Sequence, residues 1–174
     1  DRDSLQLVSD NTRVLLTVTK MGHPEISDYS KEKLFEDYGL TPDEMSDLLN
    51  KKSGVLGISG ISSDIREVEA GIEAGDEHAK LAMEMYDYRI KKYVGAYAAA
   101  MGGVDIVVFT AGVGEHQWDV RRGAVHGLEF MGIELDEEKN RKNCGEEEII
   151  STPASKVKVV VVPTDEELLI ASDT

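Results

Sequence analysis

The residues from Thr110 to Glu115, TAGVGE, have the types and spacing best suited to chemistry in this chain. They follow an apolar run, 105–110, that predicts a strand buried on both faces, and they precede a helical pattern that begins near His116. A glycine loop between a strand and a helix can hold a phosphate, because the backbone comes close and free N–H groups point outward. Glycines two residues apart are weak evidence alone, since many tight turns need them.

Several charged residues allow both a structural and a functional interpretation. Asp64 precedes a helical pattern with Glu67 three residues on, which favours a helix cap over a ligand contact, and Arg66 alone is typical of a solvated first turn. Glu115 suits a helix start, and its alternative role is to steer a hydrated cation beside phosphates. Glu166 is equally typical of a helix N-terminus, although Mg²⁺ keeps several waters and needs only one or two carboxylates.

The remaining reactive side chains show no catalytic pattern. Metal-ligand spacing is absent among the four histidines, His23, His78, His116 and His126. Cys144 is the single cysteine, so an intrachain disulfide is excluded and a reducing cytosol is the simplest location. The tyrosines at 86, 93 and 97 follow the apolar stripe of a long predicted helix, and we expect them in the core.

The elements that must position these residues predict one α/β domain. Helices are expected over 30–38, 41–50, 64–74, 76–101, 116–131 and 136–143, with a last helix from Thr164, and strands over 13–19, 105–110 and 157–162. Residues 53–63 form a Gly/Ser-rich connector. Strands that alternate with helices run parallel through right-handed crossovers. The loops 110–115 and 163–167 should then meet at the edge where such sheets bind ligands.

The composition limits the partners. The chain has 174 residues and a formal charge of -15, which argues against nucleic acid or an anionic membrane surface, although a local glycine loop can still hold a small anion. We find no signal peptide and no apolar run long enough to span a membrane, and we expect a cytoplasmic protein. Because the sequence does not begin with Met, we expect it to be a fragment.

Longer segments resemble the acetate kinase family, within the superfamily of acetate and sugar kinases and actin. The similar segments are YGLTPDEMSDLLNKKSGVLGISGISSDIREVE (38–69), DEHAKLAMEMYDYRIKKYVGAYAAAMGGVDIVVFTAGVGEH (76–116), GLEFMGIELDEEKN (127–140) and IISTPASKVKVVVVPTDEELLIASDT (149–174). The resemblance implies an actin-like or ribonuclease H-like ATPase fold, here incomplete. It divides the chain into a divergent segment, 1–29, and a carboxy-terminal nucleotide-binding domain, 30–174.

The resemblance also implies roles for individual residues. Asp64, Ile65 and Arg66 would line the adenosine pocket, and Glu166 would position Mg²⁺ through water. The residues that would hold the nucleotide phosphates and adenine are Gly112, Val113, Gly114, Glu115 and the adjacent His116, which stands where the family usually has asparagine. The implied cofactors are ATP or ADP with Mg²⁺. We therefore expect Gly114→Ala to weaken nucleotide binding more than stability.

The departures from the family limit the expected activity. Family members are roughly twice this length, and the half that supplies most of the acetate pocket is absent. The family's catalytic arginine has no counterpart, since no arginine lies between Arg13 and Arg66. Three hypotheses remain: part of a kinase that forms acetyl phosphate and ADP from ATP and acetate only with the missing half, a non-catalytic MgATP- or MgADP-binding module, and a module that forms a homodimer. A propionate or butyrate kinase would share this half.

Overall fold

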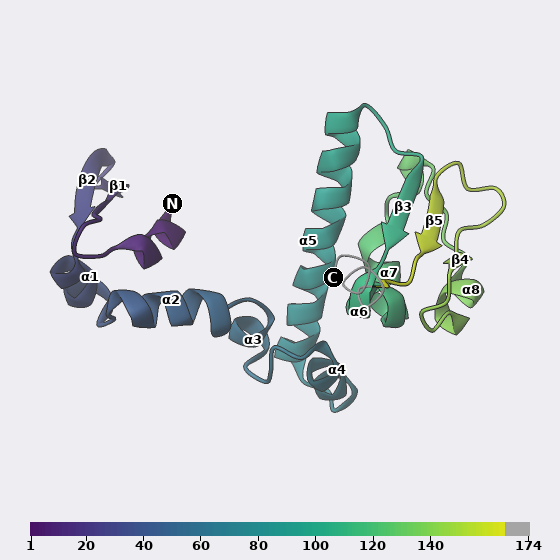
Figure 1. Cartoon of the computed structure of the whole chain (residues 1–174), viewed down its shortest axis with the longest axis horizontal. Coiled ribbons are helices and arrows are strands. Elements are labelled where there is room, and N and C mark those ends of the chain that lie inside the picture. Colours follow the sequence, from purple (N-terminus) through teal and green to yellow (C-terminus); the bar gives the residue numbers. More distant parts are fainter. Residues whose placement is uncertain (166–174) are drawn as a thin grey trace, which may run out of the picture. The chain divides into compact units, whose positions relative to one another are not determined.

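The computed structural model describes residues 1–165 (Figure 1). They belong to two compact units, Asp1–Ala82 and Met83–Thr174, which we describe separately. The boundary falls within the long helix α5, Glu77–Met101. The predicted last helix lies outside the described residues apart from its first positions, Thr164 and Asp165.

The first unit is built on a β-hairpin followed by short helices. Its elements are η1 (Arg2–Leu7), β1 (Val14–Lys20), β2 (His23–Tyr29), α1 (Lys31–Tyr38), α2 (Pro42–Lys51), α3 (Gly54–Ser59) and α4 (Ile65–Glu73). The two strands are antiparallel and join at Met21 and Gly22, whose φ angles of 49° and 84° suit a two-residue hairpin turn. The core of this unit consists of Leu5, Val8, Val14, Leu16, Tyr29, Leu34 and Met45.

Local signals account for most helix boundaries in the first unit. Ser30 caps α1, which ends at Gly39 with a left-handed φ of 68°. The Thr41 side chain and Glu44 form the expected capping box at the start of α2. The prediction of a connector over 53–63 was wrong in part, because Gly54–Ser59 is a short helix, α3.

The second unit contains a three-stranded sheet with the order β3-β5-β4. Its elements after α5 are β3 (Ile106–Phe109), α6 (Ala111–His116), α7 (Trp118–Val125), η2 (Glu129–Met131), α8 (Glu137–Lys142), β4 (Glu148–Ile149) and β5 (Lys158–Val161). Strands β3 and β5 are parallel, in the register Ile106 to Lys158 through Phe109 to Val161, which confirms the predicted parallel pair. The antiparallel β4 was not predicted.

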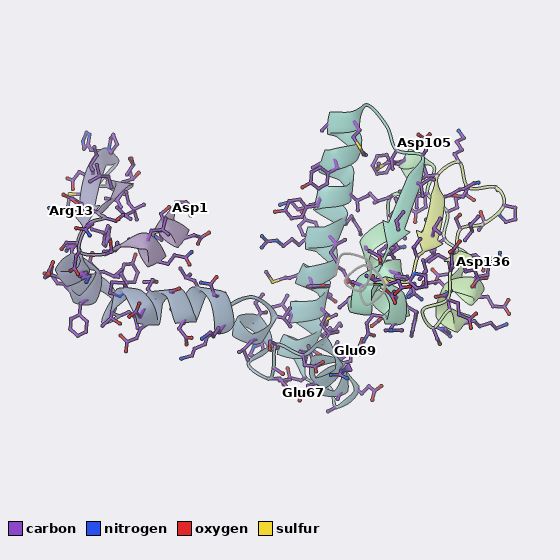
Figure 2. All side chains as sticks on the ribbon, in the orientation of Figure 1. Asp1, Arg13, Glu67, Glu69, Asp105 and Asp136 are labelled. Atoms are coloured by element: carbon purple, nitrogen blue, oxygen red, sulfur yellow. The ribbon has the colours of Figure 1, made fainter. Side chains whose placement is uncertain are left out.

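The predicted helix 116–131 is in fact three shorter elements. Gln117 leaves the helical region with φ -100° and ψ 90°, so it ends α6 and begins α7. Gly127, with φ +84°, then separates α7 from η2. Asp136 caps α8 by accepting a hydrogen bond from the Lys139 amide (Figure 2). These breaks bring the glycine loop, α7 and α8 into one packed group.

Only one face of the sheet is buried. Phe109, Val159 and Val161 pack with α7 in the main core of the unit. On the other face, 52% of Ile106 and 53% of Val108 is exposed, so the prediction of a strand buried on both faces was wrong. The reason is that no described helix covers that face of the sheet.

The expected apolar stripe of α5 is buried only in part. Ile90 and Val94 pack against the core of the second unit, and Tyr86 is half-buried. Tyr93 and Tyr97 are 51% and 62% exposed, and Met101 is also exposed, so placing all of them in the core was wrong. Ala98, next to Tyr97, is buried, so the exposed tyrosines lie on a different face of α5 from its buried residues, and the periodicity of the stripe does not distinguish the two faces.

Candidate functional site

The predicted phosphate loop follows β3 directly and is itself a short helix, α6. Thr110 is extended, and Ala111 has a φ of 58°, which is uncommon for a residue other than glycine. The amides of Gly112 and Val113, in the first turn of α6, make no hydrogen bond to another described residue. Two backbone donors therefore remain at the carboxyl end of β3.

Thr164 holds the second predicted loop against the first. Its hydroxyl lies 2.8 Å from the Thr110 hydroxyl and accepts a hydrogen bond from the Ala111 amide at 3.0 Å. Its amide and hydroxyl donate to Glu115 Oε1 at 2.8 and 2.9 Å. The two loops at the carboxyl ends of β3 and β5 therefore meet at one edge of the sheet.

These bonds give Glu115 a contact that neither of its two interpretations from the sequence included. The amide of Thr164 and then its hydroxyl lower the pKa of the Glu115 carboxyl, so the carboxylate is the form that the fold binds. Both donors reach the same oxygen, Oε1. Glu115 thus joins the two loops.

The two glycines of the loop have different surroundings. A β-carbon added to Gly114 would lie 3.2 Å from the carbonyl carbon of Phe109 and 3.4 Å from its Cα. A β-carbon added to Gly112 would meet nothing within 4 Å. A β-carbon at Gly114 would therefore require a small shift of α6 against the end of β3, so Gly114→Ala also affects packing, and its expected effect on nucleotide binding stays a prediction. Gly112 is the glycine whose open side faces away from the protein.

Arg121 of α7 binds the carbonyl groups of the glycine loop, and the sequence analysis did not identify it. Its side chain is fully buried, and its Nη1 donates to the carbonyls of Gly114 and Glu115 at 3.0 and 2.6 Å. Its Nε donates to Asn140 Oδ1 at 2.7 Å, and its Nη2 donates to the carbonyls of Asn140 and Asn143 at 2.8 and 3.1 Å. All five donors of the guanidinium are used, and they join α6 to α8.

A signal for Arg121 was present in the sequence. The residue lies three, four and seven positions before Ala124, Val125 and Leu128, all of which are buried. An arginine in the apolar stripe of a helix must satisfy its donors inside the protein. A search for cations within apolar stripes would therefore have singled it out.

His116 and Trp118 lie beside the loop. A β-carbon on Gly145, which follows α8, would lie 2.6 Å from His116 Cε1, so the exposed imidazole rests against the backbone there. The guanidinium of Arg141 lies 4.6 Å from the centre of the Trp118 ring. Both rings are therefore positioned by the segment around α8.

Asp64, Ile65 and Arg66 lie in the first unit, at the start of α4. Asp64 caps this helix through the Arg66 amide, as the helix-cap interpretation predicted. The same carboxylate accepts hydrogen bonds from Arg66 Nε at 3.0 Å and Nη2 at 2.6 Å, and these bonds lower the pKa of Asp64. The Arg66 side chain is exposed, and Ile65 is half-buried.

The predicted metal residue, Glu166, lies outside the described residues. Within residues 1–165, no group of three or more histidine, cysteine, aspartate or glutamate side chains is placed to hold a metal ion. In the same part of the chain, no helix combines the length and apolar character that a membrane span requires.

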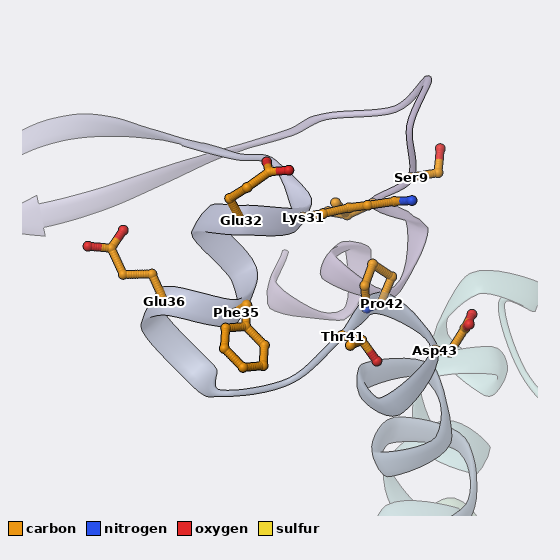
Figure 3. A pocket seen from close by; sticks show the side chains of 9 residues that line it. Ser9, Lys31, Glu32, Phe35, Glu36, Thr41, Pro42 and Asp43 are labelled. Carbon is orange, nitrogen blue, oxygen red and sulfur yellow. The ribbon is translucent and has the colours of Figure 1, made fainter.

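A hollow of about 650 Å³ in the first unit is lined by none of the predicted site residues (Figure 3). Glu32, Glu36 and Asp43 line it together with the cation Lys31, which is paired with Asp10 at 2.7 Å. A surface with this excess of carboxylates repels phosphate. It is therefore not a candidate nucleotide site.

The parallel strand pair with a glycine loop at its carboxyl edge defines a mixed α/β protein of the kind that binds ligands at that edge. Residues 27–172 match the model of the Acetokinase family. The chain belongs to this family, which confirms the resemblance stated from the sequence.

Individual relatives agree with this assignment. The acetate kinase of Bacteroides thetaiotaomicron is 64% identical over 141 residues, which are 81% of this chain and 35% of the relative. The crystal structure of Porphyromonas gingivalis acetate kinase matches with a TM-score of 0.76 and 62% identity over 81% of this chain and 35% of that one. A propionate kinase from Francisella tularensis matches with a TM-score of 0.72 and 35% identity, over 82% and 36% of the two chains. The chain thus spans about a third of the length of these relatives.

Proposed function

We propose that this chain is the nucleotide-binding part of an acetate kinase, which transfers the γ-phosphoryl group of ATP to acetate and forms acetyl phosphate and ADP reversibly. The observation that carries the proposal is the pair of free amides at Gly112 and Val113, placed at the carboxyl edge of a parallel strand pair. Backbone donors of this kind suit the oxygens of a phosphate, and phosphoryl transfer depends mainly on positioning and charge neutralisation.

The other predicted residues take their roles from the same proposal. Asp64, Ile65 and Arg66 contact the adenosine, and Glu115 and His116 flank the phosphates. Glu166 positions Mg²⁺ through water. The exposed guanidinium of Arg66, oriented by Asp64, supports this assignment because it is free to stack on a base.

Catalysis requires the part of the enzyme that this chain lacks. Most of the acetate pocket belongs to that part, and residues 19–27 of this chain contain no counterpart of the catalytic arginine, so the chain alone binds nucleotide without turnover. Within it, residues 30–174 form the nucleotide-binding domain and 1–29 a divergent segment. The match to a propionate kinase means that acetate, propionate and butyrate remain alternatives for the acyl substrate.

The proposal is tested by calorimetric titration of the full 174-residue chain with MgADP, with Trp118 fluorescence as a second signal. The wild type should bind one equivalent, and Gly112→Ala should bind at least about tenfold more weakly. Gly95→Ala is the matched control, because its β-carbon also meets nothing within 4 Å but lies on α5. A folded wild type that does not bind MgADP, or equal binding by Gly112→Ala, would contradict the proposal.

A second candidate function, self-association, is favoured by the exposed face of α5. Tyr88, Tyr93 and Tyr97 are exposed there, and the rings of Tyr93 and Tyr97 stack with their centroids 6.1 Å apart. Exposed aromatic clusters of this size are typical of protein interfaces. Sedimentation equilibrium should show a homodimer that Tyr97→Glu dissociates, whereas a monomeric wild type at all concentrations would exclude this function.

A further inference from the structure

Two acidic side chains are partly buried where α5 packs on α7. Asp87 lies on α5, and a β-carbon on Gly123 of α7 would lie only 2.0 Å from Asp87 Oδ2. Asp119 precedes Gly123 by four residues and so lies one turn away on the same face of α7. The two helices therefore contact each other through a carboxyl group set against a glycine.

One oxygen of each carboxyl group is buried and unsatisfied within the described chain. The Oδ1 atoms of Asp87 and Asp119 are both buried, and neither has a hydrogen-bond partner among the described residues. A buried carboxylate without a donor is costly, and a second carboxylate close by increases that cost. Protonation of one group removes the repulsion and supplies a donor.

The other charged groups around this contact do not change that conclusion. On α7, Arg121 donates to the carbonyls of the glycine loop and of α8, and Arg122 pairs with Glu137. On α5, Lys91 favours the ionised form of Asp87 and so lowers its pKa. This effect is smaller than the effects of burial and of Asp119, which both raise the pKa. Burial, followed by the charge of Asp119, raises the pKa of Asp87 to about 7.

We propose that the contact between α5 and α7 is a pH-responsive element, tight while Asp87 carries a proton and loosened once Asp87 is ionised beside Asp119. The element is placed to act on the glycine loop, because Gln117 joins α6 to α7 and Arg121 of α7 binds loop carbonyls. The inference does not depend on nucleotide binding.

The direction in which stability changes with pH follows from the raised pKa of Asp87. A carboxyl group whose pKa is raised on folding contributes stability at low pH and loses it as pH rises through the folded value. The stabilising contribution of Asp87 is therefore complete below about pH 4, where the unfolded group titrates. It is lost between that value and about pH 7.

The first test is an NMR titration of the aspartate side-chain carboxyl carbons in the full chain. The expected result is one aspartate, assigned by its loss in Asp87→Asn, with a midpoint near pH 7. Asp119→Asn should lower that midpoint, because it removes the neighbouring charge. A midpoint for Asp87 below about pH 5 would overturn the proposal. If Asp87→Asn does not fold, the Asp87 signal can instead be assigned in the wild type, from spectra that link each side-chain carboxyl carbon to its backbone.

The second test compares melting temperatures between about pH 5 and about pH 9. The wild type should lose at least about 5 °C more than Asp87→Asn over this range, since asparagine stays neutral. Glu84→Gln, which removes an exposed charge from the same helix, is the control and should retain the wild-type slope. An Asp87→Asn profile parallel to that of the wild type would overturn the proposal.

Discussion

Replacement of Arg121 by methionine should destabilise the second unit strongly. Methionine retains most of the apolar stem but removes five donors. Three of the lost bonds, to Asn140 Oδ1 and to the carbonyls of Asn140 and Asn143, are fully buried, and water cannot easily replace them. Each buried acceptor left without a donor lowers the free energy of unfolding by about 1–3 kcal/mol. Part of this loss is offset because the variant no longer buries a positive charge. The expected net loss is about 3–5 kcal/mol.

The assay is thermal and urea denaturation followed by circular dichroism, together with hydrogen exchange. For a unit of this size the loss corresponds to a fall in Tm of at least about 12 °C. Exchange of the Ala111 and Gln117 amides of the loop, which donate to Thr164 Oγ1 and to the Val113 carbonyl, should accelerate, because Arg121 no longer holds the carbonyls of Gly114 and Glu115.

Arg122→Met is the matched control, since Arg122 is the next residue of the same helix and makes an exposed pair with Glu137 at 3.2 Å. Its loss should cost less than about 1 kcal/mol. Equal losses for the two variants, or an unchanged exchange rate in the loop, would refute the view that Arg121 supports the loop.

Three further predictions concern the loops and the start of α4. Gly114→Ala should lower stability by about 1–3 kcal/mol, because its β-carbon contacts Phe109. Gly112→Ala should leave Tm unchanged but weaken MgADP binding. Melting curves measure the first effect and calorimetric titration measures the second. Asp64→Asn keeps the helix cap but loses the exposed bonds to Arg66, so Tm should change by less than about 2 °C while MgADP affinity falls, and unchanged affinity would leave Asp64 with the cap alone. The lowered pKa of Glu115 means that its stabilising contribution is present above about pH 4.3 and is lost as pH falls through the folded value. Glu115→Gln should therefore flatten the acid limb of the stability curve, and an acid limb identical to that of the wild type would contradict the contact with Thr164.

Local signals in the sequence were sufficient for much of the fold. Thr41 and Glu44 form the capping box that their spacing predicts, and Gly39 ends a helix as expected. The parallel pair of β3 and β5, and the meeting of their following loops, also followed from the order of strands and helices. These features depend on neighbours in the chain or on general rules of handedness, so a single sequence contains enough information.

The errors arose where distant packing decides the outcome. Apolar residues at Ile106 and Val108 resemble those of a doubly buried strand, but nothing in their spacing shows that the strand lies at an edge. The break at Gln117 depends on contacts of α6 and α7 rather than on a glycine or proline. The place of Arg121 in an apolar stripe could be predicted, but its partners could not, because they are mostly backbone carbonyls, which leave no trace in the sequence.

The exposed side of the three-stranded sheet has a consequence for the behaviour of the chain in solution. Ile106 and Val108 lie on one strand, and the exposed Ile149 lies on another strand of the same sheet. An uncovered apolar sheet face next to an edge strand attracts other copies, but a net charge of -15 keeps them apart through mutual repulsion. Colloidal stability should therefore depend on this charge: near the isoelectric point of about 4.6, or in concentrated salt, the repulsion is lost and the chain should precipitate while its helices remain folded.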